Sequence, residues 1–369
     1  MKKILPAVFV FFALVSTEAE DISPFVMPSA RAAGFGGVHA ALGDDFFSLF
    51  SNPASFTGIT RQFSAAEISV SIYGPVFDIL DRVAANNGSA DISSLIQRPQ
   101  DFGAGIDLGG PIALGLVDRG FGFGIFNRTT VDASVRGLTI YPLFSEEVFM
   151  VGGFSFRVLE QENHFLDLGF LGKAFYRGVL DLSGSIIDVS EITKQASSAP
   201  YASQFGIGLD LGIRYTFANC LTLALAGYDV YSPALVTRYA EIADRGAGGK
   251  QVYGTVTPRL ALGVLYRIQN DFLDRYISGA MVMLDYRDFI DLFSSDPRNP
   301  VLNLSLGMEI TVMEILRIRA GIADALPSVG FGLDMHVLTL DVAVRGKELG
   351  DNPWNNQVLA LDLGILFRY

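Results

Sequence analysis

Val358-Leu-Ala-Leu-Asp-Leu-Gly-Ile-Leu-Phe-Arg-Tyr369 is the stretch that decides the fold of this chain. Every second residue is large and apolar, and the residues between them are mostly small or charged. The apolar positions are Leu359, Leu361, Leu363, Ile365, Phe367 and Tyr369. Because successive side chains of a strand point to opposite faces, this pattern predicts a β-strand with one apolar and one polar face. Alone, it fits an edge strand of a soluble sheet as well as a strand whose apolar face meets lipid.

The composition favours the second alternative. Half of the 369 residues are hydrophobic, and the mean hydropathy is +0.36. After the first 20 residues, however, no apolar run of about 18 residues is long enough for a membrane-spanning helix. A closed barrel is the other structure that satisfies every backbone group in lipid. The net charge of −12 and the absence of a basic stripe argue against nucleic acid as a partner.

The first residues have the pattern of a secretory signal peptide. Met1-Lys-Lys3 is positively charged, 4–15 is apolar, and Thr17-Glu18-Ala19 places small residues at the cleavage positions. We therefore expect 1–19 to be removed and the mature chain to begin near Glu20, outside the cytoplasm.

The alternation of apolar and polar residues recurs along most of the chain after Thr60. In Phe205–Phe217 every odd position is apolar, while Asp210 and Arg214 lie among glycines on the other face. A polar face that mixes both charges with glycine is expected to line a wet lumen, whereas soluble sandwiches expose more Lys and Glu. About fourteen strands are expected, at 62–73, 102–117, 121–136, 147–158, 165–178, 204–216, 220–229, 257–267, 275–287, 301–311, 314–322, 328–335, 338–345 and 357–369.

The lengths of the connections support an antiparallel barrel. Outer-membrane barrels have short periplasmic turns and longer extracellular loops. With the last strand ending at the periplasmic side, the brief connections fall on that side. The long connections, at about 74–101, 179–203, 230–256, 288–300 and 346–356, then lie on the extracellular side. The strand count carries an uncertainty of two, because Gly109-Gly-Pro111 is either a bulge or a turn.

Residues 21–59 lack the alternation and contain a distinct set of motifs. Small residues and glycines between Ser29 and Gly43 permit close backbone packing. Asp44-Asp45 is expected to start a short helix that carries Phe46, Phe47 and Phe50, because acidic residues are favoured at a helix N-terminus. Asn52-Pro53 is expected to end it.

These motifs resemble the N-terminal plug of the FadL-type long-chain fatty-acid transporters. The resemblance covers about 30 residues. It rests on Arg31, Gly34, Gly36, Gly37, Ala40, Asp44, Asp45, Asn52, Pro53 and Ala54. The resemblance implies an all-β fold, in which a plug at 20–60 lies inside a transmembrane antiparallel barrel at 61–369. It also implies that extracellular loops 179–203 and 230–256 capture the substrate, and that a kink in the third strand, 121–136, gives a lateral exit. The strand 358–369 resembles the terminal strand that the barrel-assembly machinery recognises.

The candidate site residues are aromatic residues of the expected plug and arginines that are expected to face the lumen. Phe35, Phe46, Phe47 and Phe50 are expected either to line an apolar pocket or to fill the lumen around the plug. Arg317 and Arg319 lie on one face of one strand and are candidates for steering a carboxylate headgroup, the alternative being structural ion pairs.

Catalysis and metal binding are not expected. Cys220 is the single cysteine, no Gly-x-Ser-x-Gly elbow is present, and His39, His164 and His336 have no ligand spacing. We expect no cofactor.

The expected function is a channel in the bacterial outer membrane for passive uptake of long-chain fatty acids or similar hydrophobic molecules, gated by the plug. Two alternatives remain: a plugged barrel with a structural or partner-binding role, as in secretion-machine shuttles, and a general porin.

Overall fold

The structure is a computed structural model, in which most of the chain is described. The described residues are 19–37, 39–43, 45–77, 103–136, 139–182, 184–185, 198–245, 248–269 and 277–368. The expected signal peptide lies outside them except for its last residue, and so does Asp44. Large parts of two expected long loops, 78–102 and 186–197, also lie outside.

Fourteen strands form a closed antiparallel barrel, as predicted. The first and last strands, β2 and β18, pair with each other and close the ring. The strands of the ring are β2 (Gln62–Tyr73), β3 (Gly103–Asp118), β4 (Phe121–Arg136), β5 (Thr139–Gln161), β6 (His164–Asp181), β8 (Tyr201–Phe217), β9 (Leu221–Tyr231), β12 (Arg259–Arg267), β13 (Gly279–Tyr286), β14 (Leu304–Val312), β15 (Leu316–Ala323), β16 (Leu326–Asp334), β17 (Leu338–Glu348) and β18 (Gln357–Arg368).

Smaller elements lie at the start of the chain and between the barrel strands. The N-terminal ones are β1 (Glu20–Ile22), α2 (Ala30–Gly34), η1 (Phe46–Phe50) and η2 (Pro53–Gly58). The others are β7 (Gly184–Ser185), β10 (Pro233–Tyr239), η6 (Ile242–Asp244), β11 (Lys250–Val256), η7 (Asp291–Phe293) and η8 (Pro300–Asn303).

The two faces of the wall follow the alternation of the sequence. On β14, Leu306 and Met308 are exposed on the outside of the barrel, whereas Ser305 and Glu309 face the lumen and are buried. The other strands repeat this division, so the exposed exterior is apolar over the whole circumference. Such a surface is stable in the hydrocarbon of a bilayer, where pairing between the strands of a closed ring satisfies backbone groups that lipid cannot.

A charge on the membrane face is expected to cost stability according to its depth. Leu363 lies in the middle of β18, and Leu359 lies near its first residue; both point outward. We expect Leu363→Arg to lower the free energy of unfolding in lipid vesicles by about 2–4 kcal/mol and Leu359→Arg by about 0–1 kcal/mol. Denaturant titration of the folded barrel in vesicles measures both values. Equal losses would contradict the assignment of this face to lipid.

Short turns gather at one end of the barrel, as expected, although β15 and β16 are also joined by a two-residue turn, Asp324-Ala325, at the opposite end. Arg119, Ala218, Met313 and His336, each in a turn at the former end, adopt positive φ angles between 34° and 67°. Left-handed residues of this kind allow two antiparallel strands to reverse over two or three residues. The same end holds the last residue of β18, Arg368.

Two expected loop regions are wrong in part. β5 begins at Thr139 instead of 147, so the connection to β4 is short. The expected loop 230–256 contains the hairpin of β10 and β11, which extends β9 and β12 beyond the ring. β10 pairs with β8 over six residues, and this ladder stabilises a segment that lacked a clear alternating pattern.

The expected kink in 121–136 is also wrong: the interruption lies in the neighbouring strand. β4 pairs with β5 without a register shift, whereas Gly110–Ile112 of β3 leaves the ladders to both β2 and β4. Pro111 has no N–H group to donate, which favours a bulge at this point. The side chain of Asn127 accepts a hydrogen bond from the backbone N–H of Ile112 at 2.9 Å and replaces a ladder bond.

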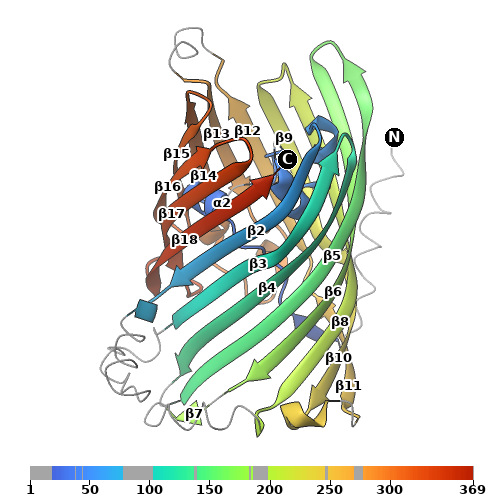
Figure 1. The fold of residues 1–369 in the computed structure, drawn as a ribbon, viewed down its shortest axis with the longest axis vertical. Helices are drawn as coiled ribbons and strands as arrows, with labels where there is room; N and C mark the ends of the chain where they lie inside the picture. Colours follow the sequence, from blue (N-terminus) through green and yellow to red (C-terminus); the bar gives the residue numbers. More distant parts are fainter. Residues whose placement is uncertain are drawn as a thin grey trace.

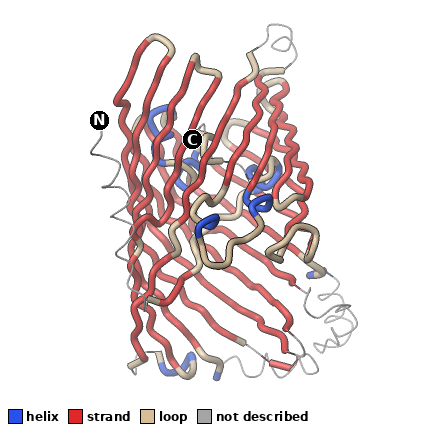
Figure 2. Tube along the Cα trace, turned by 180° about the vertical axis from the view of Figure 1, so that it is seen from behind, coloured by secondary structure: helices blue, strands red, loops and turns tan. Residues whose placement is uncertain are grey.

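The N-terminal segment lies inside the ring. Figures 1 and 2 show the short helices of residues 30–58 surrounded by strands, with the long strands β4 to β8 on one side and the short strands β13 to β17 on the other. α2 contacts β15 to β18, and η2 contacts β5, β6 and β8. The segment therefore bridges opposite walls of the barrel. Among the described residues, no helix is both long and apolar enough to cross a membrane.

Candidate functional site

Three side chains cap the short helices of the N-terminal segment. Ser29 caps α2, Asp45 caps η1 and Asn52 caps η2, each by accepting a hydrogen bond from a backbone N–H two or three residues later. Such caps satisfy the free N–H groups that a short helix leaves at its start. Asp45 thus begins the short helix expected before Asn52, which is the 3-10 helix η1, and Asn52 begins a second 3-10 helix, η2.

Asn52 also fixes the segment to the wall. Its amide group donates to the carbonyl oxygens of Ala40 at 3.0 Å and of Ile213 and Leu225 at 3.3 Å. Ile213 and Leu225 are cross-strand partners on β8 and β9. Because Asn52 is fully buried, each of these bonds replaces one that water would otherwise make.

Pro53 and Ala54 pack directly against glycines of the wall. A Cβ atom on Gly169 of β6 would lie 2.4 Å from the backbone N of Ala54, and one on Gly212 of β8 would lie 2.0 Å from Oδ1 of Asn52. These distances are too short for any side chain. The two glycines therefore provide the flat surface on which the Asn-Pro-Ala turn rests.

The glycines of the N-terminal segment make the corresponding contact with the opposite wall. Gly34 lies against the Cα of Gly330, and a Cβ on Gly36 would lie 2.8 Å from the carbonyl oxygens of Leu306 and Ile322. Gly36 also has a positive φ of 81°, which favours glycine. Gly37 also has a positive φ, but no heavy atom lies within 4 Å of the position that a Cβ would take. The backbone conformation alone, without any close contact, therefore favours glycine at this position.

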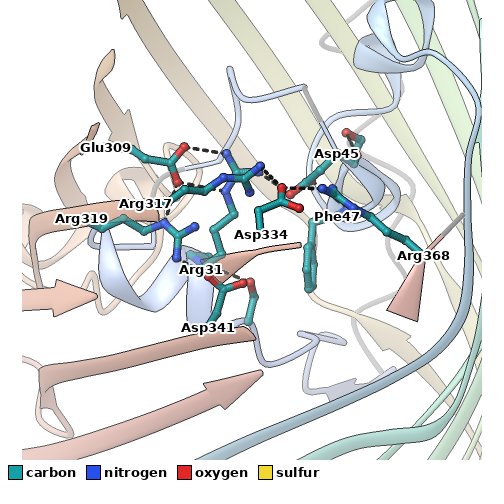
Figure 3. Close-up of polar contacts among 12 residues, drawn as sticks. Arg31, Asp45, Phe47, Glu309, Arg317, Arg319, Asp334, Asp341 and Arg368 are labelled. Carbon is teal, nitrogen blue, oxygen red and sulfur yellow. Dashed lines mark hydrogen bonds and ion pairs between the residues drawn. The ribbon is translucent and has the colours of Figure 1, made fainter. Parts of the chain in front are cut away.

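Arg31 forms the centre of a buried ion-pair network (Figure 3). Its guanidinium donates to Asp45 in the same segment, and through Nε and Nη2 to Glu309 of β14 at 3.2 and 3.0 Å. Glu309 also accepts from Nε of Arg319 at 2.6 Å, and Arg319 donates to Asp341 of β17. The network therefore ties the N-terminal segment to three strands of the wall.

Both arginines proposed for headgroup steering lie in ion pairs. Arg319 is fully buried between Glu309 and Asp341. Arg317 donates to Asp334 at 2.6 Å, and Arg368 shares the same carboxylate. These contacts favour the structural alternative, and steering of a headgroup stays a prediction.

A cavity of about 580 Å³, called here the large cavity, lies between the N-terminal segment and the wall. Phe35, Phe47 and Phe50 of the predicted set line it. Phe46 does not line it; its ring fills the space beside Gly115 and packs on Phe126 with 5.6 Å between ring centroids.

Sequence reasoning missed two aromatic residues of this cavity. Phe25 and Phe149 both line it, and their ring centroids are 5.4 Å apart. Phe50 packs edge-on against Phe149 at 5.9 Å and connects the two groups. Phe149 lies within the expected strand 147–158 and shares the buried parity of Glu147 and Val151, so the alternation there could have placed it in the lumen. Phe25 lies in a stretch without any periodic signal.

Ion pairs cover the remaining wall of the large cavity. Lys173 of β6 lies 2.7 Å from Asp210 and 2.6 Å from Asp229. Arg128 pairs with Asp107 at 2.6 Å. The cavity therefore joins an aromatic surface to a strongly polar one, a combination suited to amphiphilic molecules.

A second cavity of about 330 Å³, the small cavity, lies at the end of the barrel where β12 ends and β13 begins. Its lining is mostly polar. It includes Arg31, Arg267, Gln269, Ser278, Glu309, Thr311 and Arg317. In the part of the chain that the structure describes, no group of three or more His, Cys, Asp or Glu side chains is placed to hold a metal ion.

The fold and site define a transmembrane β-barrel of the outer-membrane type that encloses its own N-terminal segment. A scan against models of known protein families finds no match, and a sequence search of curated proteins finds no significant match.

Several solved structures have a similar arrangement of strands. They include the CymD monoaromatic hydrocarbon channel, at 14% identity over 94% of this chain and 98% of that one, with a TM-score of 0.49. The Ralstonia pickettii toluene transporter TbuX is 14% identical over 95% and 98%, with a TM-score of 0.47. A Pseudomonas aeruginosa FadL homologue is 15% identical over 95% and 98%, with a TM-score of 0.45. Similarity at this level does not identify the cargo of this chain.

Proposed function

We propose that this chain is a non-enzymatic channel of the bacterial outer membrane through which hydrophobic molecules, such as long-chain fatty acids, move passively. The observation that carries the proposal is the large cavity, which lies inside a closed barrel and has Phe25, Phe47, Phe50 and Phe149 in its lining. Its volume of about 580 Å³ is within the range typical of small-molecule sites. A lipid-like molecule would bury its apolar part against these rings.

In this proposal residues 20–60 act as the plug and gate. The segment contacts opposite walls through Asn52 and Arg31, which supports a plug that closes the lumen when no substrate is bound. A substrate that binds a shifted conformation more tightly would open the path by mass action, without an energy source. Loop residues at 179–203 and 230–256 are proposed to capture the substrate first.

The exit is proposed at the interruption of β3. Gly110–Ile112 leaves the ladders to both neighbouring strands, and Ile112 is exposed on the membrane side. A gap in the ladder is the part of a barrel wall where a lateral opening breaks the fewest hydrogen bonds. Delivery of the barrel to the membrane is proposed to use β18 as the signal for the assembly machinery and 1–19 as the signal peptide.

Binding and uptake of labelled oleate by the purified barrel in liposomes tests the function. We expect saturable binding and gated uptake in the intact protein, and unselective leakage after deletion of 21–56. Phe50→Asp is expected to abolish binding, because it places a charge among the aromatic rings.

Phe293→Asp is the matched control, since Phe293 is an aromatic residue 77% exposed on η7, away from the cavity. It is expected to leave binding unchanged. A folded barrel that binds neither oleate nor a neutral aromatic such as naphthalene would overturn the channel and favour a structural or partner-binding barrel.

A further inference from the structure

The two cavities lie on either side of one residue. Arg31 lines the large cavity and the small cavity, and among the described residues it is the one that their linings share. The small cavity lies at the end of the barrel with the short turns, where β12 ends at Arg267. A line from the large cavity to the small one therefore passes Arg31 and leads towards the end of the barrel with the short turns.

Charged side chains line both cavities, on either side of Arg31. Besides its aromatic surface, the large cavity is lined by eight Lys or Arg and seven Asp or Glu residues. In the small cavity, Arg267, Glu309 and Arg317 accompany Arg31. Such surfaces hold water and small ions, whereas a hydrophobic molecule gains little from them.

The guanidinium of Arg31 bridges the space between the segment and the wall. One side donates to Asp45 of the N-terminal segment, and the other donates to Glu309 of β14. The side chain is 95% buried and belongs to the lining of both cavities. Replacing it with a short side chain would join them and leave two carboxylates facing the opening.

We propose that the barrel contains a second, axial path for small hydrophilic ions and that the ion pairs of Arg31 keep it closed. This path differs from the proposed route of hydrophobic molecules, which leaves through the wall. The barrel thus combines a lipid channel with a closed ion pathway through the polar side of the same lumen.

Single-channel recording in planar lipid bilayers tests the proposal. The intact barrel is expected to show no conductance steps, and Arg31→Ala is expected to show them. Because Asp45 and Glu309 then face the opening, the current should be carried mainly by cations. Adding Asp45→Asn removes one of these negative charges, while Arg267 and Arg317 still line the small cavity. The reversal potential should therefore shift towards that of chloride.

Arg319→Ala is the matched control. Arg319 bonds the same carboxylate, Glu309, but lines neither cavity. If conductance came from general loosening of the network, Arg319→Ala would conduct as well as Arg31→Ala, and the proposal would be overturned. Absence of steps in a folded Arg31→Ala barrel would overturn it too. Oleate binding, measured on the same variants, reports separately on the proposed lipid function.

A chemical variant tests the same position in a folded protein. In Arg31→Cys combined with Cys220→Ser, a positively charged methanethiosulfonate reagent restores a cation at this site. The reagent is expected to suppress the steps, whereas a neutral reagent of similar size should suppress them less. Equal suppression by both reagents would show that bulk alone closes the path and would contradict the role of the ion pairs.

Discussion

Gly169→Ala is expected to release the N-terminal segment from the barrel wall. A Cβ at this position would lie 2.4 Å from the backbone N of Ala54 and from the carbonyl carbon of Pro53. Both contacts are with backbone, so no side-chain rotation relieves them and the turn must move. Movement of the turn also withdraws Asn52 from its bonds to Ile213 and Leu225. Limited proteolysis of the folded barrel should then cleave 20–60 much faster than in the unchanged protein.

Gly172→Ala provides the control on the same strand. Its Cβ would have Gly152 O at 3.7 Å as its nearest neighbour, which is an ordinary contact. The variant should therefore keep the slow cleavage of the unchanged protein. If Gly169→Ala also resists proteolysis and stays closed to small solutes, the wall does not hold the Asn-Pro-Ala turn in the way that the structure describes.

The barrel was predictable because its signal is local. Each strand has an apolar and a polar parity, and the bounds of 62–73 and 121–136 agree with β2 and β4. Errors arose where pairing partners, instead of periodicity, determine the strand. β10 forms because β8 extends far enough to pair with it, and this pairing has no counterpart in the pattern of residues 230–239.

The internal contacts of the site were less accessible to sequence reasoning. The motif with Asn52 and Pro53 indicated a plug, but which wall each residue meets depends on the closed barrel. Arg31 and Glu309 are separated by 278 positions in the chain. No periodicity connects such residues, so their pairing could be found only when the strands had been placed around the segment.

Glu309→Ala is expected to destabilise the whole barrel. Glu309 is 3% exposed and accepts hydrogen bonds from Arg31 at 3.2 and 3.0 Å and from Arg319 at 2.6 Å. Its removal takes a carboxylate partner from each of two buried guanidiniums, and breaking a buried ion pair of this kind costs about 3–5 kcal/mol. Denaturant titration in detergent, followed by the loss of β-sheet circular dichroism, measures the change.

Asp118→Asn is the control for this loss. Asp118 pairs with Arg61 at 2.8 Å, but the arginine side chain is 76% exposed, and exposed ion pairs contribute at most about 1 kcal/mol. The two variants remove the same kind of charge from the same barrel, one from the lumen and one from its rim. A loss of stability as small for Glu309→Ala as for Asp118→Asn would show that the network around Arg31 does not hold the N-terminal segment to the wall.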